Sequence, residues 1–451
     1  MEAIIVLFLS GIIALFLGIY NQPKLTTIIS VIGLIGAAIV QHYPLNILPA
    51  EYKLLEFNQV GNGFVVLAIL LTLLIVLSGQ KEFLEEKSHA GDYNALLLFS
   101  LCGGIILIGF TDLFMFFLGL EILSIPLYVL AGSKKGVSES SEAAVKYFFM
   151  GAFATCLLLF GVVLTYGATQ SFELSEILSK TINSSGNAML YVGMIFILAS
   201  FLFKVGVAPF HFWVPDVYQG SPTIFMGYMS SVVKVVGIYA FIKFFHMAFG
   251  GLYDFWSTLI AVLIGISMFI GNLSALVQTK FKRLMAYSSI TNGAYALMAI
   301  LYPSALSDST LWVFMLGYGT SVVTLLTISM ILNDDADEIA SFKGIGYRKP
   351  LIGLVAIAAL LSTSGIPPMT GFFGKLMLFS SVWSYYPWLI VFALINSAIG
   401  VYIYLRLIMT IMSKETATDT KEVTVSISQT IVLVLSLLLL VAGWLMLLCW
   451  K

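Results

Sequence analysis

The feature that most constrains this chain is a succession of apolar segments, each about as long as a membrane is thick. A helix needs roughly 20 mostly apolar residues to cross a bilayer. Fourteen segments meet this requirement, at 3–20, 24–41, 60–79, 93–110, 113–132, 143–166, 187–209, 222–246, 255–277, 284–302, 309–332, 350–382, 385–412 and 427–449. Only 10% of the residues are charged, against roughly 25% in soluble domains. The sequence therefore predicts an all-α membrane protein that crosses the bilayer about fourteen times.

The composition also argues against several classes of function. The formal net charge is −1, so no basic surface for nucleic acid is expected. Cys102, Cys156 and Cys449 form no CxxC pair, and the histidines show no HxxxH spacing, so a zinc or iron–sulfur site is not expected. The first apolar segment starts at Ala3 without a basic stretch or a small-residue cleavage site. We interpret it as a membrane helix and not as a signal peptide.

Basic residues between the segments are distributed unevenly over the two sides of the membrane. One side carries Lys24, Lys81, Lys87, Lys134, Lys135, Lys280, Lys282, Arg283, Lys343, Arg348, Lys349, Lys414 and Lys421, and the other carries Lys53, Lys180 and Lys451. Because loops rich in lysine and arginine stay in the cytoplasm, both termini are predicted to face outward. A miscounted helix in the middle of the chain would erase this asymmetry, so it also supports the count of fourteen.

Seven charged side chains remain inside the apolar segments. They are Lys146, Lys204, Lys234, Lys243, Lys375, Arg406 and Glu121. A charge at the bilayer centre costs about 2.5–3.5 kcal/mol on insertion scales, so such residues commonly mark ion pathways. The alternative is that a long side chain extends to the nearest interface and keeps its charge in water.

Depth in the membrane separates these two interpretations. Lys234 lies about twelve residues from either end of its segment, roughly 18 Å at 1.5 Å per residue, which a lysine side chain cannot span. Glu121 is similarly central and needs a partner or a proton. Lys375 lies seven residues beyond the "IPP" break, and Lys204 is closer to a nominal end, but the apolar stretch continues past Pro209. These four residues are the main candidates for a proton relay.

The remaining charged residues are weaker candidates. Lys146 lies one turn inside its boundary, and both interpretations fit it equally. Lys243 and Arg406 lie closer to helix ends and are interpreted as interfacial anchors. His211 follows Pro209, and it either satisfies backbone groups freed by the proline or carries a proton.

Two apolar segments are interrupted in similar ways. The first contains "FLFKVGVAPFHFWVPDVYQGSPT" (201–223) and the second "STSGIPPMTGFFGKLMLF" (362–379). Proline removes a helical hydrogen bond, and the freed carbonyls must be satisfied by protein or water. Interrupted helices at corresponding positions indicate an inverted repeat with an ion site between its copies. "GIYAFIK" (237–243) also resembles "GVYIYLR" (400–406), five helices later and therefore in the opposite orientation.

These observations predict a division of the chain. A three-helix segment (1–92) precedes a first inverted five-helix repeat of helices 4–8 (93–246). A second repeat of helices 9–13 (247–412) follows, and helix 14 (413–451) ends the chain. Helices 7 and 12 are the broken ones.

A lysine beside a broken helix suggests proton transfer. The opened backbone admits water, and a titratable amine in that water passes protons. Moving a neighbouring charge changes the proton affinity of the amine, and each pKa unit corresponds to about 1.36 kcal/mol. A proton crossing 100 mV needs about 2.3 kcal/mol, so a change of about two units per cycle has the size that pumping requires.

Three stretches carry a family resemblance. "FLFKVGVAPFHFWVPDVYQGSPT", "LGLEILSIPLYVLAG" and "KRLMAYSSITNGAYALMAI" resemble the antiporter-like membrane subunits of respiratory complex I, a family shared with cation/proton antiporter complexes and membrane-bound hydrogenases. The resemblance covers about 90–410, and the pattern KxGxxPFHxWxPDVYxGxPT is specific to this superfamily.

The resemblance implies roles for the candidate residues. It implies that Glu121 of the fifth helix pairs with Lys204 of the seventh, and that Lys234 lies where two half-channels meet. It implies that Lys375 is the terminal lysine toward the outer side, and that Lys146 matches a lysine of the sixth helix. Two features favour one sister subunit over the others. One is Lys375, and the other is the lack of room for a long lateral helix after helix 14.

The resemblance also implies a hetero-oligomeric complex in a bacterial inner membrane. The chain has no GxGxxG after a strand and no cluster ligands, so no cofactor is expected in it. FMN, iron–sulfur clusters and quinone are expected in partner subunits, and the partners are other membrane-arm subunits. One alternative is a subunit of a multisubunit sodium/proton antiporter or of a membrane-bound hydrogenase. Another is a structural subunit with vestigial charges, which the cost of four deep ionisable residues disfavours.

Overall fold

The protein is described by a computed structural model over residues 1–43, 55–85, 89–183, 187–303, 309–332, 337–414 and 424–449. Four lysines of the loop-charge comparison, Lys53, Lys87, Lys421 and Lys451, lie outside these described residues. Within the described ranges the chain forms helices and three isolated β-bridges but no strand. The prediction of an all-α protein is confirmed.

Helices occupy all fourteen predicted segments. The long ones are α1 (Glu2–Ile19), α2 (Pro23–His42), α3 (Gln59–Ser78), α5 (Ala90–Gly109), α6 (Leu113–Ala131), α7 (Ser138–Thr169), α9 (Ala188–Val205), α12 (Val232–Phe249), α13 (Tyr253–Leu276), α14 (Phe281–Leu297), α15 (Thr310–Leu332), α17 (Pro350–Ser364), α18 (Thr370–Trp383), α19 (Pro387–Ile411) and α20 (Ile427–Ala442). The short ones are α4 (Gln80–Glu85), α8 (Leu174–Asn183), α10 (Trp213–Gly220), α11 (Thr223–Ser230) and α16 (Ile345–Arg348).

By length and hydropathy, twelve helical stretches of the described chain qualify as membrane spans. One of them, Thr223–Leu276, contains two crossings, because the 3-10 turn Gly250–Leu252 separates α12 from α13. The broken pair α17–α18 supplies another crossing, since α17 has only 15 residues. The structure therefore agrees with a count of fourteen.

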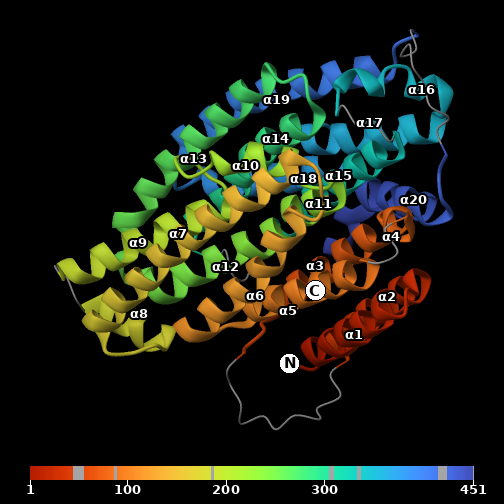
Figure 1. The fold of residues 1–451 in the computed structure, drawn as a ribbon. Coiled ribbons are helices and arrows are strands. Elements are labelled where there is room, and N and C mark those ends of the chain that lie inside the picture. The colour runs from red at the N-terminus through yellow and green to blue at the C-terminus, as the bar shows by residue number, and fades with distance from the viewer. Residues whose placement is uncertain are drawn as a thin grey trace.

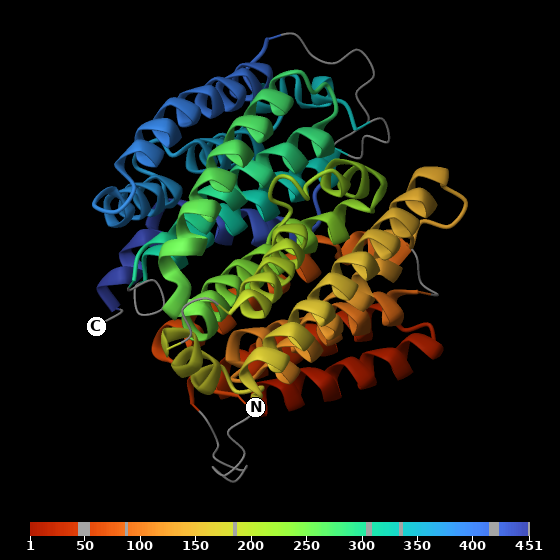
Figure 2. The same cartoon turned by 90° about the vertical axis from the view of Figure 1, so that its left-hand side faces the viewer.

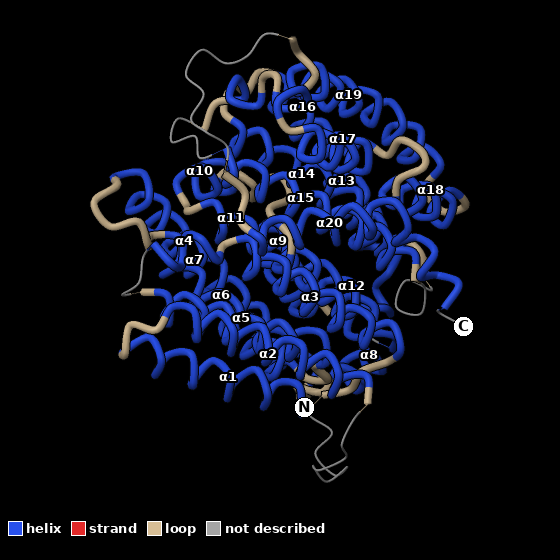
Figure 3. Tube along the Cα trace, turned by 90° about the vertical axis from the view of Figure 1, so that its right-hand side faces the viewer, coloured by secondary structure: helices blue, strands red, loops and turns tan. Residues whose placement is uncertain are grey.

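The helices form a bundle in which the early and the late parts of the chain lie beside each other (Figure 1). Turned by 90°, the molecule shows α1, in red, along one outer edge and α19, in blue, at the opposite edge (Figure 2), and Figure 3 shows the same order from the other side. Between them, α15 is buried along almost its whole length and contacts α3, α11, α17, α18 and α20. Polar side chains on the central helices are therefore shielded from lipid.

The two predicted helix breaks are confirmed, and both are built around a glycine. Gly206 ends α9 with φ +70°, and Gly365 ends α17 with φ +80°. Glycine adopts this left-handed conformation without the cost that a Cβ brings. Each glycine N–H donates to carbonyls of the preceding turn. A cis peptide bond follows each glycine at the same distance, before Pro209 and before Pro368.

The resemblance between residues 237–243 and 400–406 also has a structural counterpart. Lys243 donates to the Ile108 carbonyl at 2.9 Å, at the end of α5. Arg406 donates to the Leu276 carbonyl at 3.0 Å, at the end of α13. Each cation thus caps the C-terminal end of the first helix of its predicted repeat, where the helix dipole is negative. Lys243 is only 6% exposed, so it is a buried helix cap and not the interfacial anchor that the sequence suggested.

Candidate functional site

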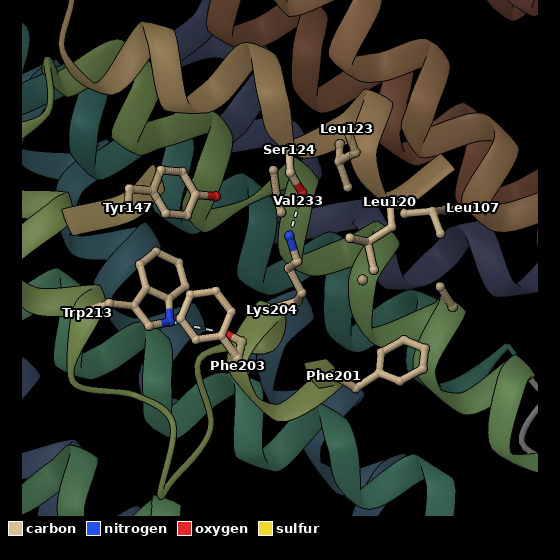
Figure 4. A pocket seen from close by; sticks show the side chains of 12 residues that line it. Leu107, Leu120, Leu123, Ser124, Tyr147, Phe201, Phe203, Lys204, Trp213 and Val233 are labelled. Carbon is tan, nitrogen blue, oxygen red and sulfur yellow. Dashed lines mark hydrogen bonds between the residues drawn. The ribbon is translucent and has the colours of Figure 1, made fainter. Parts of the chain in front are cut away.

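Lys204, in the last turn of α9, points away from its own helix toward α6. Its Nζ donates to Ser124 Oγ and to Tyr128 OH, both at 3.1 Å, and Figure 4 shows Ser124 directly in front of the ammonium group. The cavity around Lys204 has a volume of about 20 Å³, which is room for about one water molecule. Lys204 is therefore held by hydroxyl groups, which both accept and donate protons.

Glu121 lies on the same face of α6 as Ser124 and Tyr128, because residues three and seven apart share a helix face. Its carboxylate accepts a hydrogen bond from Thr155 Oγ1 of α7 at 2.7 Å. In the described part of the chain it forms no ion pair with Lys204. The pairing implied by the resemblance is therefore indirect here: the Ser124 and Tyr128 hydroxyls contact the lysine, and Glu121 lies one turn away from Ser124.

Lys234 lies near the start of α12, just after the chain departs from helical geometry at Ser231. Its side chain is 2% exposed, and its Nζ donates to the Ser289 carbonyl of α14. A Cβ at Gly293 would approach this Nζ to 3.1 Å, so the glycine leaves room for the ammonium group. The Ser289 hydroxyl is buried without a hydrogen-bond partner in the described structure. A water molecule would satisfy it.

Lys375 of α18 turns back into the second break. Its Nζ donates to the carbonyls of Thr363 and Ser364, at 3.1 and 3.0 Å. These are among the last carbonyls of α17, where the helix dipole favours a cation. The ammonium group also lies 4.8 Å from the centre of the Tyr295 ring, a cation–π distance. Lys375 is 7% exposed, so its ammonium group is buried inside the bundle.

Lys146 is more exposed than Lys204, Lys234 and Lys375. Its side chain is 42% exposed, and its Nζ contacts Glu142 at 2.7 Å and Asp216 at 2.8 Å. Asp216 of α10 also accepts a hydrogen bond from Arg283 of α14 at 3.0 Å. Burial raises the pKa of the Asp216 carboxyl, but the hydrogen bonds from Lys146 and Arg283 outweigh burial and lower the pKa below its ordinary value. The structure thus places Lys146 in an ion-pair cluster at the end of the bundle.

His211 lies in the irregular segment between α9 and α10. It is 5% exposed, its ring is 4.3 Å from that of Phe212, and its Nδ1 has no hydrogen-bond partner among the described residues. Neither sequence-based interpretation of His211 is decided by these contacts. The structure does not bring it into hydrogen-bonding contact with Lys204, Lys234 or Lys375.

Sequence reasoning missed the partners of these charged residues: Ser124, Tyr128, Asp216 and Tyr295 for the lysines, and Thr155 for Glu121. Hydroxyl and aromatic side chains occur throughout these apolar segments, so nothing in their local sequence distinguishes them. Asp216 had a usable signal, since it is a carboxylate beside a helix break. Among the described residues, no group of three or more histidine, cysteine, aspartate or glutamate side chains is placed to hold a metal ion.

A bundle of membrane-spanning helices with two broken helices and buried titratable residues beside the breaks defines a class of proteins, the polytopic ion-translocating membrane proteins. Residues 110–400 match the family described as NADH:quinone oxidoreductase/Mrp antiporter, transmembrane. Since this match covers more than half of the sequence, the chain belongs to that family.

Relatives and a solved structure agree with this membership. The chain is 33% identical over 449 residues to NADH-quinone oxidoreductase subunit N of Cytophaga hutchinsonii, covering 98% of this chain and 97% of the relative. It is 35% identical over 421 residues to the subunit of the same name from Flavobacterium psychrophilum, covering 92% of each. A chain of respiratory complex I from Thermus thermophilus superposes with a TM-score of 0.84 at 28% identity, covering 98% of this chain and 97% of that one.

Proposed function

We propose that this chain is the proton-translocating membrane subunit N of a bacterial NADH-quinone oxidoreductase. The observation that carries the proposal is the set of three deep lysines, Lys204, Lys234 and Lys375, each held by oxygen acceptors of neighbouring backbone or hydroxyl groups. In the described structure none of the three forms an ion pair. A buried amine with such partners is free to gain and lose its proton without breaking a salt bridge.

In this proposal, protons pass along the chain in steps that charge controls. Glu121 and the hydroxyls of Ser124 and Tyr128 set the charge and the hydrogen bonding around Lys204. Lys234 receives the proton where the two repeats meet, and Lys375 passes it toward the outer side. A shift of about 1.36 kcal/mol in local electrostatic energy changes a proton affinity tenfold. In this proposal, charge changes in neighbouring subunits drive each step by shifting these proton affinities.

The proposal assigns electron transfer to other chains. FMN, iron–sulfur clusters and quinone belong to partner subunits, and this chain contributes translocase activity and no redox centre. It lies in the bacterial inner membrane with both termini on the outer side and contacts other membrane-arm subunits. Segments 93–246 and 247–412 act as two inverted repeats, with 1–92 and 413–451 at their flanks. His211 and Lys146 are secondary candidates for the relay.

Purification of the tagged chain from its own membranes tests this assignment. We expect a gentle detergent extract to retain flavin and NADH:quinone reductase activity with the chain. Recovery of other membrane subunits without flavin or iron would contradict the proposal. It would favour a subunit of a multisubunit sodium/proton antiporter, which belongs to the same family, and sodium-dependent exchange would then be measured.

A further inference from the structure

Two cavities follow each other along the contact between α7 and α10. The cavity nearer the proposed cytoplasmic end of the bundle, called the outer cavity because it is nearer the protein surface, has a volume of about 150 Å³. It is lined by Glu139, Glu142, Lys146 and Asp216. The inner one is the cavity of about 20 Å³ around Lys204. The outer cavity is polar and lies at the end of the bundle proposed to face the cytoplasm, whereas the inner one is lined mainly by apolar side chains.

An aromatic pair separates these cavities. Ala143 lines the outer cavity and Tyr147, one turn deeper on α7, lines the inner one. On α10, Asp216 lines the outer cavity and Trp213, one turn deeper, lines the inner one. The Tyr147 and Trp213 rings are stacked, with centres 4.9 Å apart and planes 10° from parallel. Both flank the space next to Lys204 in Figure 4.

The ion-pair cluster holds this stack in place. The two carboxylate oxygens of Asp216 bind different cations, Oδ2 the Lys146 ammonium of α7 and Oδ1 the Arg283 guanidinium of α14. Asp216 therefore ties α10 to two neighbouring helices one turn from Trp213. The Trp213 indole N–H donates to the Phe203 carbonyl at 3.1 Å, which fixes the other end of the ring.

The helix that carries Trp213 is a short unit with non-helical backbone at both ends. α10 has eight residues, preceded by the break after Gly206 and followed by Ser221 in extended conformation. The motion that we assign to it is a rotation as a body about these two ends, where hinges commonly lie. A small rotation of α10 would separate the rings and join the two cavities, whereas the inner cavity as it stands holds about one water molecule.

We propose that the stacked Tyr147–Trp213 pair is a gate between a water-filled proton inlet and Lys204, and that Asp216 is the positioning residue that keeps the gate closed. This proposal rests on the proposed function, because it concerns how protons reach the relay. The inlet is proposed to conduct protons along water molecules. Breaking either Asp216 ion pair would release α10 and admit a chain of water molecules to Lys204.

The test measures access of a small ion to the inner cavity in the assembled complex. Ser124→Cys places a thiol in this cavity, in a background in which Cys102, Cys156 and Cys449 are replaced by alanine. Silver ions are added to membrane vesicles, and the fraction of unreacted thiol is read by alkylation and mass spectrometry. Loss of an aromatic stack shifts the open population severalfold, so Trp213→Ala is expected to raise the reaction rate up to about tenfold. Trp213→Phe keeps a ring and should react nearly as slowly as the parent.

Asp216→Asn removes the charge and keeps the shape, and it should also raise the rate, whereas Asp216→Glu should preserve it. The matched control is Glu139→Cys, because Glu139 is exposed and lines the outer cavity, and the reaction rate of this thiol should be the same in every variant. An unchanged rate at Ser124→Cys in both Trp213→Ala and Asp216→Asn would overturn the gate, as would equal acceleration at both cysteines. If Trp213→Ala does not assemble, Asp216→Asn alone decides. Silver access does not require pumping, so normal pumping by variants of the relay lysines would refute the proposed function and leave this result intact.

Discussion

The two helix breaks share a backbone design but hold their lysines differently. At the first break Lys204 precedes the glycine and reaches sideways to the hydroxyls of Ser124 and Tyr128 on another helix. At the second break Lys375 follows the glycine, on α18, and its Nζ donates to carbonyls of the preceding helix, α17. Hydroxyl partners rotate and exchange protons, whereas carbonyls only accept. The first break therefore suits proton exchange through side-chain hydroxyls, whereas at the second break only backbone carbonyls of a helix end accept hydrogen bonds from the ammonium group.

This difference means that side-chain substitutions should affect the first break more than the second. Lys234 stands between the two breaks and bonds to one carbonyl, that of Ser289. It belongs to neither environment, and its loss should interrupt transfer whichever break limits the rate. The expected effects below run from the largest to the smallest.

Lys234→Ala should have the largest effect on pumping. It removes the titratable group at the centre of the relay, so we expect the ratio of protons pumped to electrons transferred to fall by about tenfold or to the leak level, the equivalent of about 1.4 kcal/mol or more. The measurement is proton uptake by inverted vesicles driven by NADH. Lys180→Gln is the matched control, because Lys180 lies in α8, outside the long spans, and bonds to the Thr169 carbonyl. A normal ratio in Lys234→Ala, with the subunit assembled, would contradict the relay.

Ser124→Ala combined with Tyr128→Phe tests the first break. The double substitution removes both hydroxyl partners of Lys204. A hydrogen bond contributes a net of about 0.5 kcal/mol or more, so the loss of two is expected to lower pumping at least severalfold. Ser364→Ala is the counterpart at the second break. It leaves the Ser364 carbonyl available to Lys375 and should change little. Equal losses at the two breaks would refute the comparison.

Gly365→Ala tests the backbone at the second break. An alanine at φ +80° is expected to cost about 1–2 kcal/mol, and its Cβ would lie 2.7 Å from Lys375 Cδ. We expect a lower melting temperature of the purified complex together with a severalfold fall in pumping. Gly136→Ala is the control, since Gly136 has φ +83° but no atom within 4 Å of the added Cβ. It should lower stability alone, and a similar fall in pumping in both variants would argue against a specific effect on Lys375.

The spans and the deep lysines were accessible from the sequence because they depend on local properties. Hydropathy over about 20 residues predicts a crossing, and distance from the ends of a segment predicts the depth of Lys234. Proline within an apolar segment predicted both breaks, and the structure adds the glycine on which each is built. These inferences need no knowledge of which helices touch.

The partners of the lysines could not be predicted because they depend on how the helices rotate against each other. The central spans are apolar on all sides, so their sequences do not show which face meets a neighbour. Lys204 meets Tyr128 across 76 residues of sequence, and Arg283 meets Asp216 across 67. The same limit explains the indirect contact between Glu121 and Lys204. Only the packing of α6 against its neighbours decides whether a carboxylate or a hydroxyl faces the ammonium group.

A single type of substitution, tyrosine to phenylalanine, gives the finest test of the comparison. Tyr128 contacts Lys204 through its hydroxyl, with the ring centre 5.7 Å away. Tyr295 presents its ring to Lys375 at 4.8 Å, and its hydroxyl donates elsewhere, to the Ala393 carbonyl at 3.4 Å. Tyr128→Phe should therefore lower pumping, and Tyr295→Phe should not.

Tyr295→Leu removes the ring and with it a cation–π contact of about 0.5 kcal/mol or more, so a fall in pumping of at least roughly twofold is expected. The measurement is again the ratio of protons pumped to electrons transferred, with Tyr295→Phe as its control. Equal losses in Tyr295→Phe and Tyr295→Leu would show that the hydroxyl matters at the second break as well. Lys375 would then depend on a side-chain relay like that of Lys204, and the two breaks would differ in geometry but not in mechanism.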